Sequence, residues 1–249
     1  MSDHGLHEAF SVLKSKRVFF GHQSVGSNIL RGIESLASDD STLALTLVHL
    51  EDSTRLPISF FAERQIGENS KPNTKCADFQ KILEVQLKGK VDVAIMKFCY
   101  VDITADTDVE GMFQTYCSTI DTLRAHLPSV TFVHATVPLT FGPARWKQII
   151  SRILGKTISS EVSNVKRNRY NSMVRARFAG DPIFDLESVE STYPDGSRES
   201  FSVGGKEYYS LVPAFSGDGT HLNLEGSRRA GRTLVEALAG AIARKSERN

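Results

Sequence analysis

Cysteine is scarce in this sequence: the 249 residues include three, Cys76, Cys99 and Cys117, at wide and unequal spacing. Three scattered cysteines do not provide a disulfide framework or the paired CxxC ligands of a metal site. The N-terminal segment lacks the apolar core of a signal peptide, so we expect a protein of the reducing cytoplasm. No apolar run approaches the roughly 20 residues of a membrane-spanning helix, and we expect no membrane span.

An excess of charge of one sign is also missing. Lysine and arginine number 30 against 29 aspartate and glutamate residues, which gives a formal net charge of +1. Binding to nucleic acid depends on a basic field that neutralises phosphates, so we expect no nucleic-acid partner. With 40% hydrophobic and 24% charged residues, the composition is that of an ordinary globular protein, which excludes the disordered and fibrous classes.

Apolar segments typical of strands alternate with segments of helical periodicity along the sequence. Most of the strand segments are apolar on both faces, as in a parallel sheet that helices cover on both sides. The pattern predicts an α/β fold with a five-stranded parallel sheet, in a single domain over residues 16–249, preceded by an amphipathic leader helix in residues 1–15. The expected strands are Lys16–Gly21, Leu43–Leu50, Val91–Phe98, Val130–Val137 and Pro182–Leu186.

The connector from Glu51 to Thr74 is unusually long and rich in turn-forming residues. Long loops in compact domains are mostly functional, and we expect a functional loop here. In open parallel sheets the ligand crevice lies outside the carboxyl ends of the strands, so functional side chains are expected just after four of the predicted strands. These strand ends are Gly21, Phe98, Val137 and Leu186.

The first of these strand ends carries the segment Gly21–Gly26, which opens the following helix. Its two glycines fit the start of a phosphate-binding loop, but Ser27 and Asn28 stand where that motif needs Lys and Ser or Thr, which argues against nucleotide binding. What remains is Ser24 at a strand-to-helix turn, where unpaired backbone N–H groups can stabilise an oxyanion. Serine is also a good helix N-cap, and this loop alone favours the capping role.

A second candidate segment, Asp218–Asn223, directly precedes the last predicted helix. A carboxylate three residues before a histidine on one tight loop, as in Asp218 and His221, can orient the imidazole and stabilise its charged form. A D-x-x-H spacing alone is weak evidence, because it also arises by chance and at helix caps. Together with a serine after the first strand of an alternating α/β protein, the spacing becomes specific.

The two segments resemble the nucleophile and Asp-His blocks of the SGNH (GDSL-like) hydrolases. The similarity covers nearly the whole sequence, from residue 16 to about residue 244, and is strongest in DGTHLNLEG at Asp218–Gly226. The resemblance implies a three-layer flavodoxin-like fold in which Ser24 is the nucleophile, His221 the general base and Asp218 the residue that orients the histidine. The block order differs from that of the α/β-hydrolases, whose nucleophile lies in a G-x-S-x-G elbow near the middle of the sequence.

By the same resemblance, Gly67 in the long connector would supply an oxyanion N–H group, with Asn69 beside it as a further substrate-binding candidate. The family's G-x-N-D block is replaced here by Lys97–Asp102, without the glycine or the asparagine, and the first block is one residue longer than G-D-S. Removing one oxyanion donor typically costs on the order of 10²–10³ in rate. A substitute donor could come from Tyr100, Cys99, another loop or the substrate; we favour Tyr100, because a phenolic O–H is the better donor.

Other polar residues have less specific interpretations. His22 could contact substrate beside the serine or could be a hydrogen-bonded structural group, and both interpretations remain open. The remaining histidines do not form a ligand set with the cysteines, so we expect no metal site. The segment 142–156 places apolar residues on one helical face among basic ones, which suits a lid, a membrane-surface contact or ordinary packing. The basic residues between Lys166 and Arg177 are interpreted as a solvated helix face.

The sequence therefore predicts a serine esterase that cleaves a carboxylic ester, such as a sugar O-acetyl or a lipid ester, through an acyl-enzyme and without a cofactor. The alternative is a non-catalytic or weakly active protein of the same fold that binds a carbohydrate or acyl ligand. The altered block Lys97–Asp102 favours this alternative, whereas Ser24, Asp218 and His221 together favour the enzyme. The identity of the substrate and the oligomeric state stay open.

Overall fold

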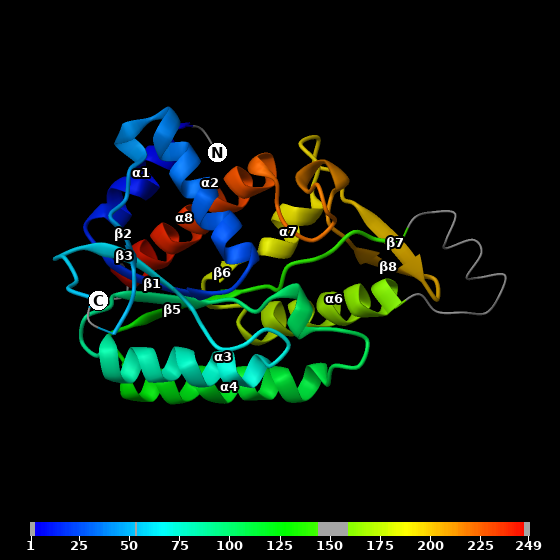
Figure 1. Ribbon diagram of the computed structural model, residues 1–249, viewed down its shortest axis with the longest axis horizontal. Coiled ribbons are helices and arrows are strands. Elements are labelled where there is room, and N and C mark those ends of the chain that lie inside the picture. The colour runs from blue at the N-terminus through cyan, green and yellow to red at the C-terminus, as the bar shows by residue number, and fades with distance from the viewer. Residues whose placement is uncertain (1–2, 53, 144–158, 247–249) are drawn as a thin grey trace.

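A parallel β-sheet forms the centre of the protein, as the computed structural model, which describes residues 3–52, 54–143 and 159–246, shows (Figure 1). Over these residues the sheet has six strands in the order β2-β3-β1-β4-β5-β6, and every neighbouring pair is parallel. The strands are β1 (Arg17–His22), β2 (Leu47–His49), β3 (Phe60–Gln65), β4 (Val93–Met96), β5 (Thr131–Ala135) and β6 (Ile183–Phe184).

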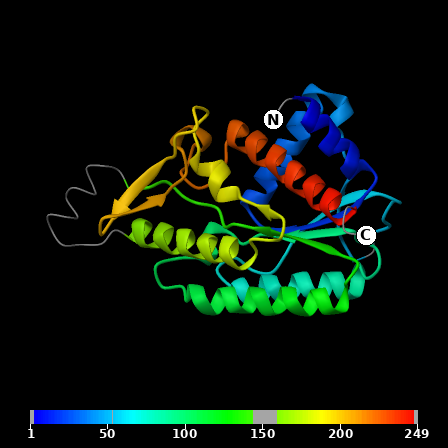
Figure 2. The same cartoon turned by 180° about the vertical axis from the view of Figure 1, so that it is seen from behind.

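Helices cover both faces of this sheet, which makes the expected three-layer α/β/α arrangement. Seen from both sides in Figures 1 and 2, α1, α2, α7 and α8 lie over one face and α3, α4 and α6 over the other. Because side chains alternate across a strand, Phe20 joins the hydrophobic core under the first group of helices and its neighbour Phe19 joins the core under the second. The helices are α1 (Asp3–Lys14), α2 (Val25–Asp39), α3 (Pro72–Lys81), α4 (Val109–His126), α6 (Ser159–Arg177), α7 (Leu186–Ser191) and α8 (Leu224–Ser246).

The sheet has one strand more than the sequence analysis predicted. The missed strand is β3, which lies within the connector assigned as a loop and is inserted between β2 and β1. Its first half, Phe60 to Ala62, is apolar and buried, but Glu63 and Arg64 follow directly, so the apolar run is too short to be recognised by itself. The adjacent edge strand β2 is only three residues long, shorter than the segment Leu43–Leu50 predicted there.

Helices α2 and α8 lie directly against each other over one face of the sheet. At their contact, a Cβ atom added to Gly32 of α2 would lie 1.9 Å from the backbone oxygen of Ser227 in α8, so only glycine permits this approach. Helix α1 packs against α8 through the buried side chains of Leu6, Phe10 and Leu13. This packing matters for the site, because Ser24 directly precedes α2 and the segment Asp218–Asn223 directly precedes α8.

A small hairpin projects from the body between α7 and α8. Its strands, β7 (Ser200–Val203) and β8 (Lys206–Tyr209), are antiparallel and joined by Gly204 and Gly205, both with the positive φ that a two-residue hairpin turn requires. Of the predicted helix at 142–156, all but the first two residues lie outside the described part of the protein. Within the described part, none of the helices combines the length and apolar character needed to cross a bilayer.

Candidate active site

Ser24 lies at the turn between the carboxyl end of β1 and the start of α2. Its backbone has φ 47° and ψ −103°, outside the regions that serine ordinarily occupies, and its side chain makes no capping hydrogen bond to α2. Instead, Ser24 Oγ lies 2.7 Å from His221 Nε2. The capping role that the loop alone suggested is therefore not the one that the side chain has, and the strained backbone turns the hydroxyl toward the imidazole.

His221 is oriented by Asp218 from the tight loop before α8. The Asp218 Oδ2 atom lies 2.8 Å from His221 Nδ1, and Oδ1 accepts backbone N–H groups of His221 at 2.7 Å and Thr220 at 2.8 Å. These hydrogen bonds hold the pKa of Asp218 well below its usual range, and the bond from the His221 backbone N–H has the largest effect. The carboxylate therefore stays ionised. An ionised carboxylate at Nδ1 favours the tautomer with its proton there, which leaves the Nε2 lone pair facing Ser24 Oγ.

Two polar side chains of α2 attach the histidine loop to the serine side of the site. Asn28 Oδ1 accepts the Leu222 N–H at 3.3 Å, and an Arg31 guanidinium nitrogen donates to the Leu222 oxygen at 2.9 Å. Both bonds join residues that are more than 190 positions apart in sequence. The sequence analysis missed this role; the only available signal was that Asn28 and Arg31 share one face of the helix that Ser24 precedes.

Tyr100 forms a wall of the site next to His221. The two ring centroids are 5.7 Å apart at an interplanar angle of 81°. Behind Tyr100, its backbone oxygen accepts hydrogen bonds from Arg167 Nε at 3.1 Å and from a terminal nitrogen of the same guanidinium at 2.9 Å. Arg167 is buried, and burial lowers its pKa to about 10. The assignment of Arg167 to a solvated helix face is therefore wrong, because this side chain supports the turn that carries Tyr100.

The two other predicted oxyanion donors are occupied within the protein. The Gly67 N–H donates to Asp78 Oδ2 at 2.8 Å, so it does not face a substrate. Cys99 is fully buried, and its thiol lies 3.3 Å from the backbone oxygen of Gln23. These positions contradict the predicted donor roles of Gly67 and Cys99. The physical reason is that each group already has a hydrogen-bond partner within the protein, Gly67 in the following helix α3 and Cys99 in the turn after β1.

Asn69 differs from Gly67 and Cys99, because its side chain is exposed and only its amide oxygen is bound from inside the protein. Lys75 Nζ donates to Asn69 Oδ1 at 3.0 Å and pairs with Asp102 at 2.5 Å, and both charged side chains are fully buried. Asp102 also accepts the N–H of Cys99 at 2.6 Å and of Ser70 at 2.9 Å. The buried ion pair therefore ties the Asn69 loop to the segment after β4, a link that no local sequence pattern indicated.

His22 is part of the interior rather than of the substrate face. Its side chain is 1% exposed, and its Nε2 atom lies 2.7 Å from Glu63 Oε2 in the neighbouring strand β3. The other Glu63 oxygen contacts His49 Nδ1 at 2.5 Å. Burial lowers the pKa of His22, and its imidazole lies directly under Gly26 of α2. This position fits a hydrogen-bonded structural group and not a side chain that contacts substrate.

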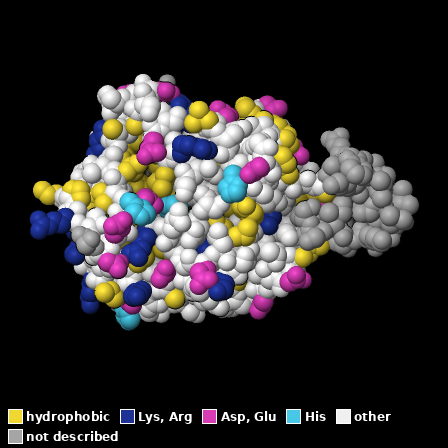
Figure 3. All heavy atoms as spheres, in the orientation of Figure 1, with side chains coloured by type: hydrophobic (Ala, Val, Ile, Leu, Met, Phe, Trp, Pro, Cys, Tyr) yellow, Lys and Arg dark blue, Asp and Glu magenta, His cyan; other side chains and the backbone are white. Residues whose placement is uncertain are grey.

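The face of the molecule drawn in Figure 3 shows a patch of hydrophobic side chains near its middle, directly beside a histidine and an acidic side chain.

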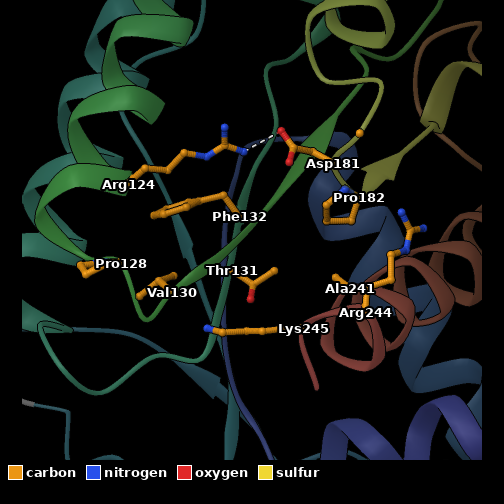
Figure 4. A pocket seen from close by; sticks show the side chains of 11 residues that line it. Arg124, Pro128, Val130, Thr131, Phe132, Asp181, Pro182, Ala241, Arg244 and Lys245 are labelled. Atoms are coloured by element: carbon orange, nitrogen blue, oxygen red, sulfur yellow. Dashed lines mark hydrogen bonds and ion pairs between the residues drawn. The ribbon is translucent and has the colours of Figure 1, made fainter. Parts of the chain in front are cut away.

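A separate cavity of about 310 Å³ lies at the opposite end of the strands, where β5 begins and α8 ends. Its walls include Thr131 and Lys245, and an Arg124–Asp181 ion pair of 2.7 Å crosses one side (Figure 4). Because this cavity is at the amino ends of the strands, it is distinct from the candidate active site.

Solved structures with similar folds come from several bacteria. A lipase/acylhydrolase from Enterococcus faecalis aligns at 14% identity with a TM-score of 0.50, over 90% of this chain and 96% of that one. A provisionally named GDSL-like lipase from Parabacteroides merdae aligns at 12% identity with a TM-score of 0.50, over 90% and 96%. A provisionally named platelet activating factor from Streptococcus pneumonia gives 13% identity and a TM-score of 0.51, over 95% and 92%.

No family model matches the sequence, and the search of curated proteins found no match. Identities of this size establish the fold alone. By its fold, the protein is of the three-layer α/β/α class with a parallel sheet. Within that class, the protein has the SGNH (GDSL-like) hydrolase fold, as the sequence resemblance predicted.

Proposed function

We propose that the protein is a serine hydrolase that cleaves carboxylic esters. The observation that carries the proposal is the continuous series of hydrogen bonds from Ser24 Oγ through His221 to Asp218, with separations of 2.7 and 2.8 Å. A nucleophile, a base and an orienting carboxylate in this order are the parts that acyl transfer needs. The similarity in fold to a lipase/acylhydrolase supports an ester substrate.

In the proposed reaction, each of these atoms has a defined role. Ser24 Oγ attacks the ester carbonyl carbon while its proton passes to His221 Nε2, and the ionised Asp218 stabilises the imidazolium. The tetrahedral intermediate then expels the alcohol, which takes the proton from Nε2, and an acyl-serine remains. Water attacks the acyl-serine with the same histidine as base, which releases the carboxylic acid and restores the serine hydroxyl.

The developing oxyanion would bind at the backbone N–H of Ser24, which has no hydrogen-bond partner among the described residues. Two side chains are candidates for the second donor. Asn69 is exposed and has its amide oxygen held by Lys75, so its NH₂ group faces away from that lysine. The hydroxyl of Tyr100 is the other candidate, since the Tyr100 ring already borders His221. An amide or a phenol here would replace the asparagine that the family carries after its third strand.

The second candidate function is a binding protein with the same crevice and no turnover. The observation in its favour is that the loop after β4, from Lys97 to Asp102, contains no asparagine and holds Gln23 directly and Asn69 through Lys75. Against it stands the strained backbone of Ser24, because a binding protein gains nothing from directing this hydroxyl at a basic imidazole nitrogen.

An active-site-directed fluorophosphonate distinguishes the two functions. If the protein is a hydrolase, the reagent adds to Ser24 and mass spectrometry of the digested protein locates the adduct there, whereas Ser24→Ala remains unlabelled. An unlabelled wild-type protein that nevertheless binds esters or sugars would support the binding function. A series of aryl esters from acetyl to long acyl groups then separates the substrate classes, because preference for acetyl favours a sugar O-acetyl ester and preference for long acyl groups favours a lipid ester.

A further inference from the structure

Lys97 is a buried lysine whose amine contacts backbone oxygens instead of a carboxylate. It follows β4 directly, is 1% exposed, and its Nζ atom lies 3.0 Å from the backbone oxygen of Gln23 and 3.2 Å from that of Phe98. Burying an amine is costly, and an isolated core position is more stable with an apolar residue. Burial also lowers the pKa of Lys97, and in either protonation state the amine keeps N–H groups to donate.

The Gln23 carbonyl oxygen accepts hydrogen bonds from several donors at once. Besides Lys97, the Cys99 thiol lies 3.3 Å from the oxygen and the Gly26 N–H donates to it at 3.0 Å. The Gln23 side chain is fixed as well, since its amide nitrogen donates to the backbone oxygen of Gly67 at 2.9 Å. Gln23 is therefore clamped between the loops that follow β3 and β4, on both sides of the strand that leads to Ser24.

Gln23 C=O and Ser24 N–H belong to one peptide unit. That unit is planar and trans, so its N–H points away from its C=O and its two ends polarise together. Holding the oxygen on the buried amine directs the Ser24 N–H to the opposite side, and hydrogen bonds to the oxygen make the N–H a stronger donor. We propose that Lys97 is a positioning residue that orients and polarises the Gln23–Ser24 peptide, so that the Ser24 N–H serves as an oxyanion donor. This inference rests on the proposed function.

This role explains two departures from the family pattern together. The first block, Gly21–Ser24, has one residue more than G-D-S, and the third block, Lys97–Asp102, lacks the family's glycine and asparagine. In the structure these departures meet, since Lys97 and Cys99 both contact the Gln23 oxygen. Lys97 and Cys99 of the altered third block thus strengthen a backbone donor through the Gln23 oxygen and do not themselves contact the substrate.

The test replaces the amine by an apolar side chain of similar length, Lys97→Met. We expect kcat for an aryl ester to fall about tenfold or more with KM within twofold, because the donor acts on the transition state and not on the bound ester. The matched control is Val93→Ala, a core truncation in the same β4 strand, which lowers the melting temperature and leaves kcat unchanged. A purely structural lysine would affect the melting temperature of Lys97→Met and not its kcat.

Full kcat in folded Lys97→Met would overturn the inference. If Lys97→Met does not fold, Lys97→Gln decides, since it keeps a polar side chain at this position but is one atom too short to keep the 3.0 Å contact with the Gln23 oxygen: a lower kcat at constant KM supports the role, and an unchanged kcat overturns it. Failure of the proposed function itself looks different. In that case wild-type Ser24 is not labelled by the fluorophosphonate, whereas failure of the Lys97 inference leaves the wild-type labelling intact.

Discussion

The hydroxyl oxygen of Ser24 and the Nε2 atom of His221 lie 2.7 Å apart although 197 positions separate the two residues in sequence. Ser24 is placed by the end of β1 and the start of α2, and His221 by the loop that enters α8. The contact between α2 and α8, together with the bonds of Asn28 and Arg31 to Leu222, holds the two segments in register.

The first prediction concerns the nucleophile and its orienting carboxylate. Ser24→Ala is expected to lose hydrolysis by at least about 10³-fold, because it removes the hydroxyl that contacts His221 Nε2, and Asp218→Asn by about 10²-fold or more, because the amide favours the wrong imidazole tautomer. Steady-state kinetics on a short acyl ester measures both. Circular dichroism should show both variants folded; ester hydrolysis at the wild-type rate by Ser24→Ala would exclude the mechanism.

The second prediction distinguishes the two candidate side-chain donors. Tyr100→Phe removes only the hydroxyl and keeps the ring against His221, whereas Asn69→Ala removes the amide and leaves the Lys75–Asp102 ion pair in place. The variant that loses the true donor should lose about 10²-fold in kcat with little change in KM. The other variant is the control and should remain within about threefold of wild type. If both keep wild-type kcat, the Ser24 N–H acts without a side-chain donor.

The third prediction concerns the helix contact on which the site depends. Gly32→Ala should destabilise the protein by about 1–3 kcal/mol, because the added Cβ would overlap the Ser227 backbone oxygen. Gly240→Ala in α8 is the matched control, since its Cβ meets no atom within 4 Å and alanine favours the helix by up to about 1 kcal/mol. Urea unfolding measures both. Equal stability of Gly32→Ala and wild type would mean that α2 and α8 can separate without cost.

The fourth prediction is a pH dependence of stability. Glu190 is 1% exposed, and burial raises its pKa to about 8 from the ordinary value of 4.5. Between these two pKa values the Glu190 carboxyl is protonated in the folded state and ionised in the unfolded state. The free energy of unfolding therefore falls as the pH rises from about 5 to about 8, and the contribution of Glu190 is constant above that range. Glu190→Gln abolishes this dependence, and its melting temperature relative to wild type should rise between pH 5 and pH 9.

The control for this measurement is Glu8→Gln, because Glu8 is exposed on α1 and its neutralisation should not change the slope. The melting temperature of each variant is recorded at several pH values in the same buffer series. A constant difference between Glu190→Gln and wild type at every pH would show that the Glu190 carboxyl is already ionised in the folded protein at pH 5.

The sequence by itself determined the alternation of strands and helices and the two segments that carry the candidate site. Both are local properties: apolar periodicity reports burial on the same element, and the Asp218–His221 spacing places both side chains on one short loop. The same local approach missed β3, because its second half is charged and its position between β1 and β2 depends on pairing with distant residues. The pattern of one segment does not record what lies beside it.

Only the tertiary structure decided which polar groups are free to act. Gly67 and Cys99 had the right residue type and place in the sequence, yet Asp78 and Gln23 occupy their donor groups. The loop of Ser24 alone favoured a capping role for its side chain, whereas the structure shows no capping bond and the hydroxyl at His221. The physical reason is that a hydrogen bond forms with the nearest partner in space, and for Ser24 and Cys99 these partners lie 197 and 76 positions away in the sequence.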